Sequence, residues 1–416
     1  MVTEEDLKKM ADDLPVVRIV DTLVKHAIIQ NASDIHIEPM EEQVLVRYRI
    51  DGLLHDAMVL PKQAGASISA RIKVLSNLKL DEKRLPQDGR FKVEVNGEKV
   101  SFRVSILPIY YGEKIVMRLL RENISGFTLE YLHFHGESLE RVHKALGLAT
   151  GMILCTGPTG SGKTTSLYTM LDILNQPDVN ISTIEDPIEY QMARINQTNV
   201  RPEIGFTFAS GLRTLVRQDP DIIMVGEIRD NETAALAVNA ALTGHLVLST
   251  IHTNSAAGAI PRLIDMKVEA FLLASTLEII IGQRLVRQLT DTKVPYTLTK
   301  AEIDQLTKIV DLNKVLEALK KEKVIKENDT WQTVKFYRAG TDEGSTGDGG
   351  FKGRVGIHEV LRMSPAIREL VMKNAATADI DAQARKEGML SMLEDGIFKC
   401  VQGLTTVEEV LRVVSE

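Results

Sequence analysis

Residues 157–165 constrain this chain more than any other stretch, because they join a glycine-rich turn to a lysine and two threonines. They follow a short apolar run at residues 152–156 and open a helical pattern at residues 165–174. A strand, a glycine loop and a helix in this order form a phosphate-binding loop, the Walker A motif. A chance glycine turn is the alternative, and both flanks argue against it. The members of the loop are Gly157, Pro158, Thr159, Gly160, Ser161, Gly162, Lys163, Thr164 and Thr165.

Each residue type in this loop has a chemical task. Glycines let successive backbone N–H groups turn toward phosphate oxygens, and the helix that follows adds partial positive charge at its N-terminus. In such loops the lysine, here Lys163, reaches the β- and γ-phosphates, and the threonine hydroxyl, here Thr164, binds magnesium. The sequence therefore predicts that this loop binds ATP together with Mg²⁺.

A second apolar run, at residues 222–225, has the form of a Walker B strand. It is followed by Gly226 and Glu227. A carboxylate at the end of such a strand can hold a magnesium-bound water or couple the sheet to the phosphates. The alternative is that Glu227 only pairs with nearby Arg229.

Carboxylates also follow the apolar run at residues 181–184. Glu185, Asp186 and Glu189 are expected at the carboxyl edge of a parallel sheet, where α/β proteins bind ligands. A carboxylate there can orient and partly deprotonate a water that attacks a γ-phosphate. A solvated turn fixed by Pro187 is the alternative.

Two histidines bracket the apolar run at residues 246–250. His245 precedes it and His252 follows it. A histidine facing phosphate can sense the γ-phosphate through a charge-assisted hydrogen bond. Satisfied structural histidines are the alternative for both.

Composition limits the function classes. Lys and Arg total 50 against 57 Asp and Glu, so the formal charge of −7 disfavours broad contact with nucleic acid. The longest apolar stretch, residues 270–282, is interrupted by polar residues and is shorter than the roughly 18 residues of a membrane span. The acidic start is unlike a secretory signal, so a cytoplasmic location is expected. Cys155 and Cys400 have no spacing that predicts a disulfide framework or a zinc site.

The patterns divide the 416 residues into several regions. A helix at residues 14–28 and alternating strands up to residue 121 predict a small α+β domain, with a hairpin centred on residues 96–97. Short apolar strands alternate with helical segments from residue 152 to 289, which predicts an α/β fold with a parallel sheet. The predicted regions are an N-terminal domain at residues 1–121, a linker at 122–128, an ATPase core at 129–289, an insert at 290–355 and a helical region at 356–416.

Taken together, these motifs resemble the secretion ATPase superfamily, whose members power type II secretion and the extension and retraction of type IV pili. EDPIE at residues 185–189 resembles its Asp box, and LRTLVRQDPDIIMVGEIRD at residues 212–230 resembles its Walker B signature. Residues 243–262 resemble its His box. The resemblance covers nearly the whole sequence and implies a RecA-like P-loop ATPase core, a PAS-like N-terminal α+β domain and a C-terminal helical region.

The resemblance also assigns roles to individual residues. It implies that Glu189 is the general base, that Glu227 is the Walker B glutamate, and that Arg103 and Arg118 are arginine fingers that close over the nucleotide. Arg118 interrupts the apolar run at residues 115–120, and an internal salt bridge is the alternative for it. The remaining implied site residues are His245 and His252 as the His-box pair, with Glu185 and Asp186 as supporting carboxylates.

Two departures from the family pattern are visible. Assembly motors often carry two Cys-x-x-Cys pairs that bind zinc, but residues 290–293 and 341–344 hold no cysteine at the corresponding places, so no zinc is expected. Retraction motors usually lack the insert, and its presence here favours an assembly motor. An additional N-terminal domain common among assembly motors is missing, either because the lineage is short or because the chain is truncated.

The resemblance implies a homo-hexameric motor for type IV pilus assembly or type II secretion. Its partner would be a platform protein of the inner membrane, and the chain would lie in the cytoplasm, peripheral to that membrane. A pilus retraction motor is the nearest alternative. A nucleic-acid translocase is disfavoured by the acidic balance, and a nucleotide-gated scaffold is disfavoured by Lys163, Glu189 and Glu227.

Overall fold

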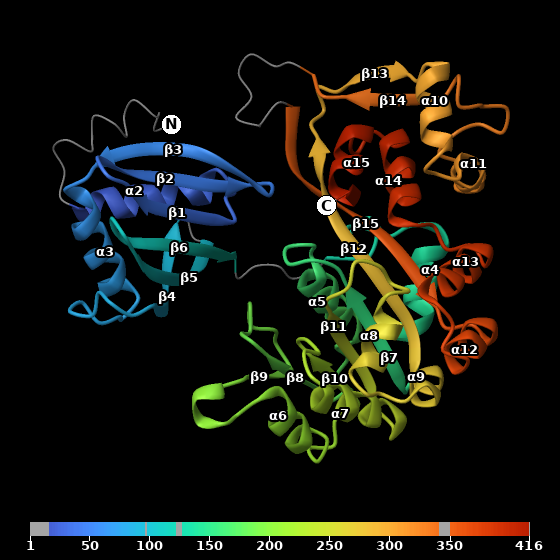
Figure 1. The fold of residues 1–416 in the computed structure, drawn as a ribbon, viewed down its shortest axis with the longest axis horizontal. Coiled ribbons are helices and arrows are strands. Elements are labelled where there is room, and N and C mark those ends of the chain that lie inside the picture. Colours follow the sequence, from blue (N-terminus) through green and yellow to red (C-terminus); the bar gives the residue numbers. More distant parts are fainter. Residues whose placement is uncertain (1–15, 96–97, 122–126, 341–349, 416) are drawn as a thin grey trace. The chain divides into compact units, whose positions relative to one another are not determined.

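The computed structural model describes residues 16–95, 98–121, 127–340 and 350–415. The chain divides into two compact units, Met1–Ile124 and Ser125–Glu416. Each unit is described by itself (Figure 1). Most of the predicted linker at residues 122–128, and residues 341–349 of the predicted insert, lie outside the described residues. No described helix is long and apolar enough to cross a membrane.

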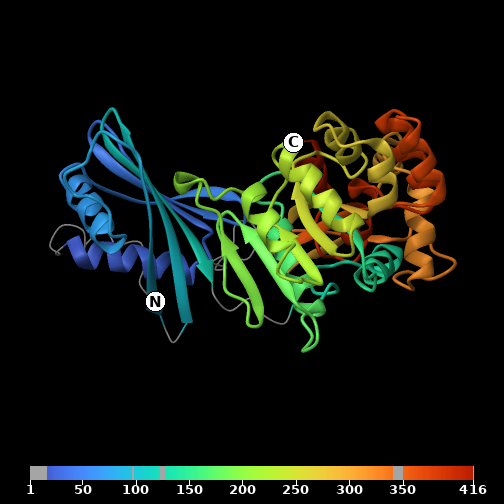
Figure 2. The same ribbon diagram turned by 90° about the horizontal axis from the view of Figure 1, so that it is seen from below.

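The described part of the N-terminal unit contains an antiparallel sheet and two helices, in agreement with the predicted α+β domain (Figures 1 and 2). Its six strands lie in the order β3-β2-β1-β6-β5-β4. The predicted hairpin is formed by β4 and β5, with Val93 opposite Val100. The elements are α2 Val16–Ile29, β1 Asp34–Pro39, β2 Gln43–Ile50, β3 Leu53–Pro61, α3 Ala64–Leu75, β4 Gln87–Val95, β5 Glu98–Ile109 and β6 Gly112–Arg121.

Alternation along the strands gives this sheet two different faces. On β5, Phe102, Val104 and Ile106 are buried in the core that includes the apolar face of α2 and α3. The residues between them, such as Arg103, lie on the other face and are exposed. Successive strand residues point to opposite faces, so the polar set shares one surface.

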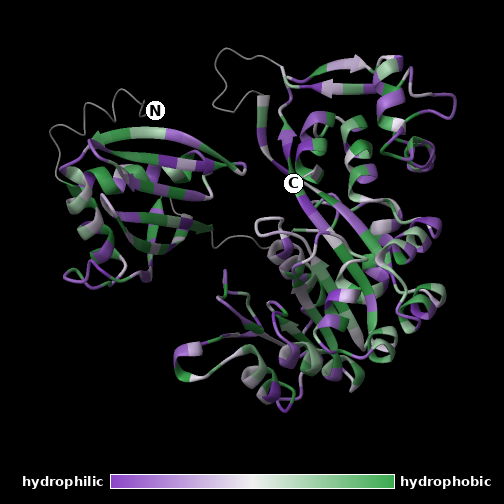
Figure 3. Ribbon diagram, in the orientation of Figure 1, coloured by the Kyte–Doolittle hydropathy of each residue, from purple (hydrophilic) through white to green (hydrophobic). Residues whose placement is uncertain are grey.

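The second unit is built on a seven-stranded sheet in the order β15-β12-β7-β11-β10-β8-β9. Its neighbours are parallel except for β15, which pairs antiparallel with β12. Figure 3 shows the inner strands in green, as expected for strands buried on both faces. The strands are β7 Gly151–Thr156, β8 Ile181–Glu185, β9 Ile195–Asn199, β10 Ile222–Val225, β11 Leu246–Ile251, β12 Leu277–Leu289 and β15 Phe351–Arg362.

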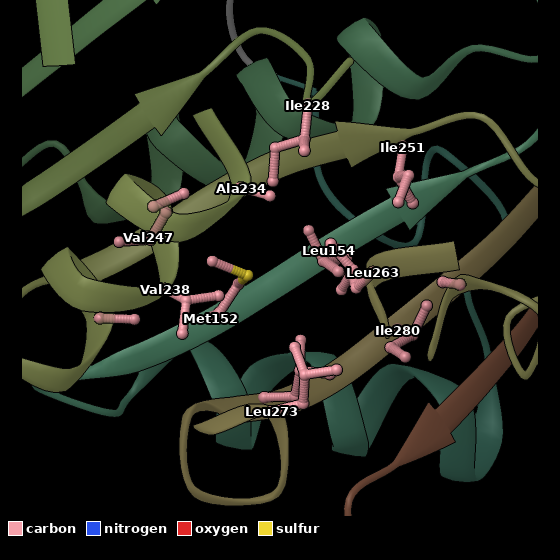
Figure 4. Close-up of a cluster of buried hydrophobic side chains, with 14 of the residues drawn as sticks. Met152, Leu154, Ile228, Ala234, Val238, Val247, Ile251, Leu263, Leu273 and Ile280 are labelled. Carbon is pink, nitrogen blue, oxygen red and sulfur yellow. The ribbon is translucent and has the colours of Figure 1, made fainter. Parts of the chain in front are cut away.

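Helices cover both faces of this sheet, which confirms the predicted α/β fold. Alternate strand residues such as Met152, Leu154 and Val247 pack in one core with α6 to α9, α12 and α13 (Figure 4). The residues between them, such as Ile153 and Leu248, pack with α4 and α5. Helix α4 Gly136–Leu146 precedes the first strand, and the elements between the strands are α5 Lys163–Leu174, the short 3₁₀ helix η1 Pro202–Ile204, α6 Phe208–Leu215, α7 Asn231–Leu242, α8 Ala259–Asp265 and α9 Ala270–Thr276.

The C-terminal region is helical, as expected, but one feature of the last third of the chain was not anticipated. The predicted boundary between insert and helical region, at residue 355, falls inside β15, which extends the central sheet. Residues 355–361 of this strand are buried. The apolar pattern expected of a buried strand is interrupted by Gly356, His358 and Glu359, so the sequence did not predict it. The insert forms β13 Val294–Thr297, α10 Lys300–Thr307, α11 Leu312–Lys321 and β14 Lys335–Arg338, and the C-terminal helices are α12 Pro365–Met372, α13 Thr377–Lys386, α14 Met392–Val401 and α15 Val407–Ser415.

A buried ionic cluster fastens α14 to its neighbours. The Asp395 carboxylate accepts from Lys399 Nζ at 2.5 Å, from His135 Nε2 at 2.6 Å and from the backbone N–H of His358 at 2.7 Å. His135 Nδ1 also lies 3.0 Å from Glu322, which ends α11 of the insert. Burial alone would lower the pKa of His135, but the hydrogen bonds to Asp395 and Glu322 raise it to about 9. The cluster therefore ties the insert to the sheet and to α4 through charge.

Candidate active site

The phosphate-binding loop has the backbone that its sequence predicts. Gly157, Gly160 and Gly162 have φ values of 144°, 81° and 89°, in the region that favours glycine. Gly157 and Gly162 also pack on Gln283, whose atoms would lie 2.3 and 2.7 Å from an added Cβ. Helix α5 begins at Lys163, and Gly162 as its N-cap gives no side-chain cap. The N–H groups of the first turn are thus left for an anion.

The side chains of the loop fit a phosphate chain. The Ser161 hydroxyl is buried and has no hydrogen-bond partner among the described residues. Lys163 is 8% exposed, and its ammonium donates to the carbonyl oxygens of Gly157 at 2.8 Å and Pro158 at 2.9 Å. Burial lowers the pKa of Lys163. Thr164 is exposed at the start of the helix, so its hydroxyl is accessible to a metal ion.

The parallel register gathers the predicted motifs at one edge. Val225 of β10 lies opposite Ile184 of β8 and Ser249 of β11, and Thr156 of β7 lies opposite Ile251. The carboxyl ends of these strands carry the phosphate loop, the Asp box, Glu227 and His252. This is the edge at which open α/β sheets bind ligands.

Glu227 lies at the centre of a charged cluster at this edge. Its carboxylate is 2.5 Å from Arg229 Nη2 and 3.4 Å from His252 Nε2. Arg229 Nη1 in turn lies 3.7 Å from Asp186. The pairing with Arg229, the alternative weighed from sequence, is therefore present, but it brings Glu227, His252 and Asp186 together. Carboxylate and hydroxyl oxygens suit Mg²⁺, which usually takes only one or two protein ligands and completes its shell with phosphates and water.

Glu185 does not face this edge, contrary to the expectation for the Asp box. Its carboxylate is buried and accepts from the hydroxyls of Tyr168 and Thr183 and from Gln197 Nε2. Burial raises the pKa of Glu185. Glu185 is the last residue of a fully buried strand, and its carboxylate points toward α5 in the protein interior.

His245 is also separated from the cluster. It precedes Leu246, which lies opposite Gly151 at the amino end of β7. The six-residue strand β11 places His245 about 20 Å from the edge that carries His252, at roughly 3.3 Å per residue. Its Nδ1 lies 2.9 Å from the carbonyl oxygen of Ala240, at the end of α7.

Arg103 and Arg118, the predicted fingers, are cross-strand neighbours in the N-terminal unit. Arg118 Nε donates to the buried Asp34 at 2.8 Å, so the salt bridge weighed from sequence exists, although Arg118 itself is exposed. Arg90 lies opposite Arg103 on the next strand. Neither Arg90 nor Arg103 has an ion pair among the described residues. Sequence reasoning left Arg90 out, yet the hairpin centre at residues 96–97 already pairs positions 90 and 103.

Two residues that support the site were not predicted from the sequence. Gln283 on β12 is 3% exposed, and its side-chain oxygen accepts from Ser166 of α5 at 2.7 Å. Glu359 on β15 accepts the backbone N–H of Ala256, in the loop after His252, at 2.6 Å. No local pattern signals either contact, because each joins segments far apart in sequence.

Glu359 gives a pH-dependent prediction. Burial raises the pKa of the Glu359 carboxyl to about 7. The stability that the protonated carboxyl contributes to the folded state is therefore fully present below about pH 4.5 and is lost as the pH rises through 7. Glu359→Gln, which resembles the protonated acid, should stabilise the chain by about 3 kcal/mol at pH 8 and change little at pH 4.5. Melting curves of wild type and variant across this range measure the effect. Glu369→Gln, on the exposed face of α12, is the control, and equal pH dependence of Glu359→Gln and wild type would contradict the prediction.

Comparison with known proteins agrees with this geometry. Residues 9–412 match the family described as "Type II/IV secretion system protein". Type II secretion system protein E of Xanthomonas campestris pv. campestris is 45% identical over 413 residues, covering 99% of this chain and 70% of that protein. The type IV pilus assembly ATPase PilB of Pseudomonas aeruginosa is 45% identical over 416 residues, covering 100% and 70%.

Solved structures share the fold. The pilus retraction motor PilT, crystallised with bound ADP, has a TM-score of 0.61 at 28% identity, covering 95% of this chain and 96% of that one. The ATPase DotB of Legionella pneumophila has a TM-score of 0.68 at 20% identity, covering 97% and 98%. With its phosphate loop and acidic cluster at one sheet edge, the chain belongs to the family of type II/IV secretion system proteins and is one of their ATPases.

Proposed function

We propose that this chain is a hexameric motor in which ATP hydrolysis powers type IV pilus assembly or type II protein secretion. The observation that carries the proposal is the meeting of the Lys163 loop, Glu227 and His252 at one edge of the sheet. The relatives at 45% identity are named for these two machines. The partner would be a platform protein, and the motor would work on the cytoplasmic side of the inner membrane.

The residues at the edge divide the chemical work. The loop N–H groups and Lys163 hold the β- and γ-phosphates, and Thr164 and Glu227 would hold Mg²⁺. The metal supplies charge neutralisation at the phosphate oxygens. Glu189 orients the attacking water and takes its proton, because a carboxylate near the γ-phosphate suits both tasks. His252 contacts the γ-phosphate. When hydrolysis removes this phosphate, His252 loses the contact, and the change affects its ion-pair partner Glu227.

The N-terminal unit supplies positive charge to the same nucleotide. We propose that Arg103 and Arg118 reach the γ-phosphate when the ring assembles and that Arg90 assists them. Loss of that phosphate on hydrolysis removes contacts that favour the closed arrangement of the two units, so a cycle of turnover becomes a cycle of domain movement.

The retraction motor is the second candidate, since PilT shares the fold. Two observations favour assembly or secretion over it. The relatives named for assembly and secretion are more similar in sequence, at 45% against 28%. The insert from β13 to β14 is a folded part of this chain, and its Trp331 and Phe336 are buried in an apolar core that it shares with β12, β15, α14 and α15.

The test is ATP turnover measured against protein concentration. Turnover per chain should rise cooperatively as the ring forms. Glu189→Gln should lower kcat by about 10² to 10⁴ while nucleotide still binds, because only the general base is removed. Lys163→Ala should lose binding as well.

Glu140→Gln, on an exposed helix surface where the carboxylate faces Lys144, is the matched control and should retain wild-type turnover. Wild-type turnover in Glu189→Gln would exclude this residue as the base. Turnover per chain that does not depend on concentration would exclude the ring mechanism.

A further inference from the structure

Hydrogen bonds donated by its backbone N–H groups hold the loop that carries Glu189 in place. It runs between β8 and β9 and has no regular secondary structure. The N–H of Ile188 donates to the Asn199 side chain at 2.7 Å, and the N–H of Met192 donates to the Gln197 side chain at 2.7 Å. The N–H of Glu189 itself donates to the hydroxyl of Tyr168 at 3.3 Å. Two of these three anchors come from the adjacent strand β9.

Tyr168 differs from the other anchors because it belongs to the phosphate-loop helix. It lies on α5, five residues after Lys163, and its side chain is fully buried. Its hydroxyl therefore joins the element that holds the phosphates to the loop that holds the proposed base. Asn199 lies on the edge strand β9, next to β8, and Gln197 of the same strand reaches α5 through this same hydroxyl, with its Nε2 3.5 Å from the Tyr168 oxygen.

The direction of the tyrosine hydrogen bond is fixed. The hydroxyl has one hydrogen, which it donates to Glu185 Oε2. Glu185 is held in turn by Thr183 Oγ1 at 2.6 Å and Gln197 Nε2 at 3.2 Å, both on its other oxygen. Only lone pairs of the Tyr168 oxygen then remain for the N–H of Glu189. Glu185 thus orients the phenol, which explains why this Asp-box carboxylate is buried.

We infer that Tyr168 is a positioning residue for ATP hydrolysis, which sets the distance between the phosphates and Glu189 through its contact with the backbone of that residue. The inference rests on the proposed role of Glu189 as the general base. A base must lie within about 0.5 Å of its working position, and a shift of about 1 Å can reduce the rate by about 10². A hydroxyl that links the two elements supplies this constraint.

The experiment compares Tyr168→Phe with wild type in the full chain. The variant keeps the ring and loses the hydroxyl. We expect kcat to fall by about 10-fold or more, while KM for ATP and the Kd of a non-hydrolysable ATP analogue stay within about twofold, because the phosphate loop keeps its residues. A structural role alone would not separate kcat from binding in this way.

Tyr48→Phe is the matched control. Tyr48 is also a buried tyrosine, and its hydroxyl donates to the carbonyl oxygen of Leu23 at 3.0 Å within the N-terminal unit. It should show a similar decrease in melting temperature and no decrease in kcat. Glu185→Gln is the second variant, because it leaves Tyr168 in place and changes the carboxylate that accepts its hydrogen. It should reduce kcat without reducing affinity, and it decides the matter if Tyr168→Phe folds poorly.

Two outcomes would overturn the inference. One is a kcat within twofold of wild type in Tyr168→Phe under conditions where Glu189→Gln is inactive, which leaves the proposed function standing. The other is a loss of affinity as large as the loss of kcat, which would make Tyr168 a support of the phosphate loop. Full turnover in Glu189→Gln would instead refute the proposed base.

Discussion

Arg103→Ala should lower ATP turnover by about 10³-fold or more and leave nucleotide binding nearly unchanged. An arginine that stabilises charge on the transferred phosphoryl group contributes about 10³ to 10⁵ in kcat. Arg103 is exposed and forms no ion pair with any described residue, so none of the described carboxylates neutralises its charge. Steady-state turnover and binding of a non-hydrolysable ATP analogue, both at concentrations that permit assembly, measure the two effects.

The control for Arg103 comes from the same sheet. Arg47 on β2 pairs with Glu38 at 2.8 Å, and Arg47→Ala should leave turnover within about twofold because that charge is already partnered. Arg118→Ala is a less direct test, since it leaves the buried Asp34 with Arg49 at 3.7 Å and so alters stability as well. Wild-type turnover in Arg103→Ala would show that the finger is wrongly assigned.

Asp395→Ala should destabilise the second unit by about 3 to 5 kcal/mol. Removing one partner of a buried ion pair leaves an uncompensated charge, and here both Lys399 and His135 lose their shared acceptor. Urea unfolding followed by tryptophan fluorescence reports on this region, because Trp331 in the insert is the single tryptophan of the chain. The midpoint should move to lower urea concentration.

Two further variants make the result interpretable. Asp304→Ala, on the exposed face of α10, should change stability by no more than about 0.5 kcal/mol. Replacing Asp395 and Lys399 together by apolar residues of similar size should restore part of the loss, because a buried pair is costly to break but not to replace. A loss below about 1 kcal/mol in Asp395→Ala would mean that the cluster does not hold the insert in place.

Much of the catalytic unit could be predicted locally. The strand at residues 222–225 has the predicted bounds, and the phosphate loop lies between strand and helix as expected. A run of apolar residues bounded by turns predicts a strand without reference to the rest of the chain, and glycines with positive φ predict a tight loop. Parallel strands end at one edge, and Glu227 and His252, which follow two of these strands, lie 3.4 Å apart there.

The orientation of side chains needed the tertiary structure. Glu185 and Asp186 are adjacent in sequence, yet one is buried against Tyr168 and the other faces Arg229. His245 resembles His252 in sequence context and lies at the opposite end of β11. Local composition does not say whether a side chain beyond a strand turns into the core or toward the site, because that depends on the helices and strands packed around it.

The sequence by itself determined the nucleotide chemistry of this protein, since the phosphate loop is a continuous segment whose backbone follows from its glycines. The tertiary structure decided what supports that chemistry. The contact between Tyr168 and the Glu189 loop, the row of Arg90 and Arg103, and the Asp395 cluster all join residues distant along the chain. Such contacts depend on strand register and helix packing, which are set by the whole core and not by any short segment.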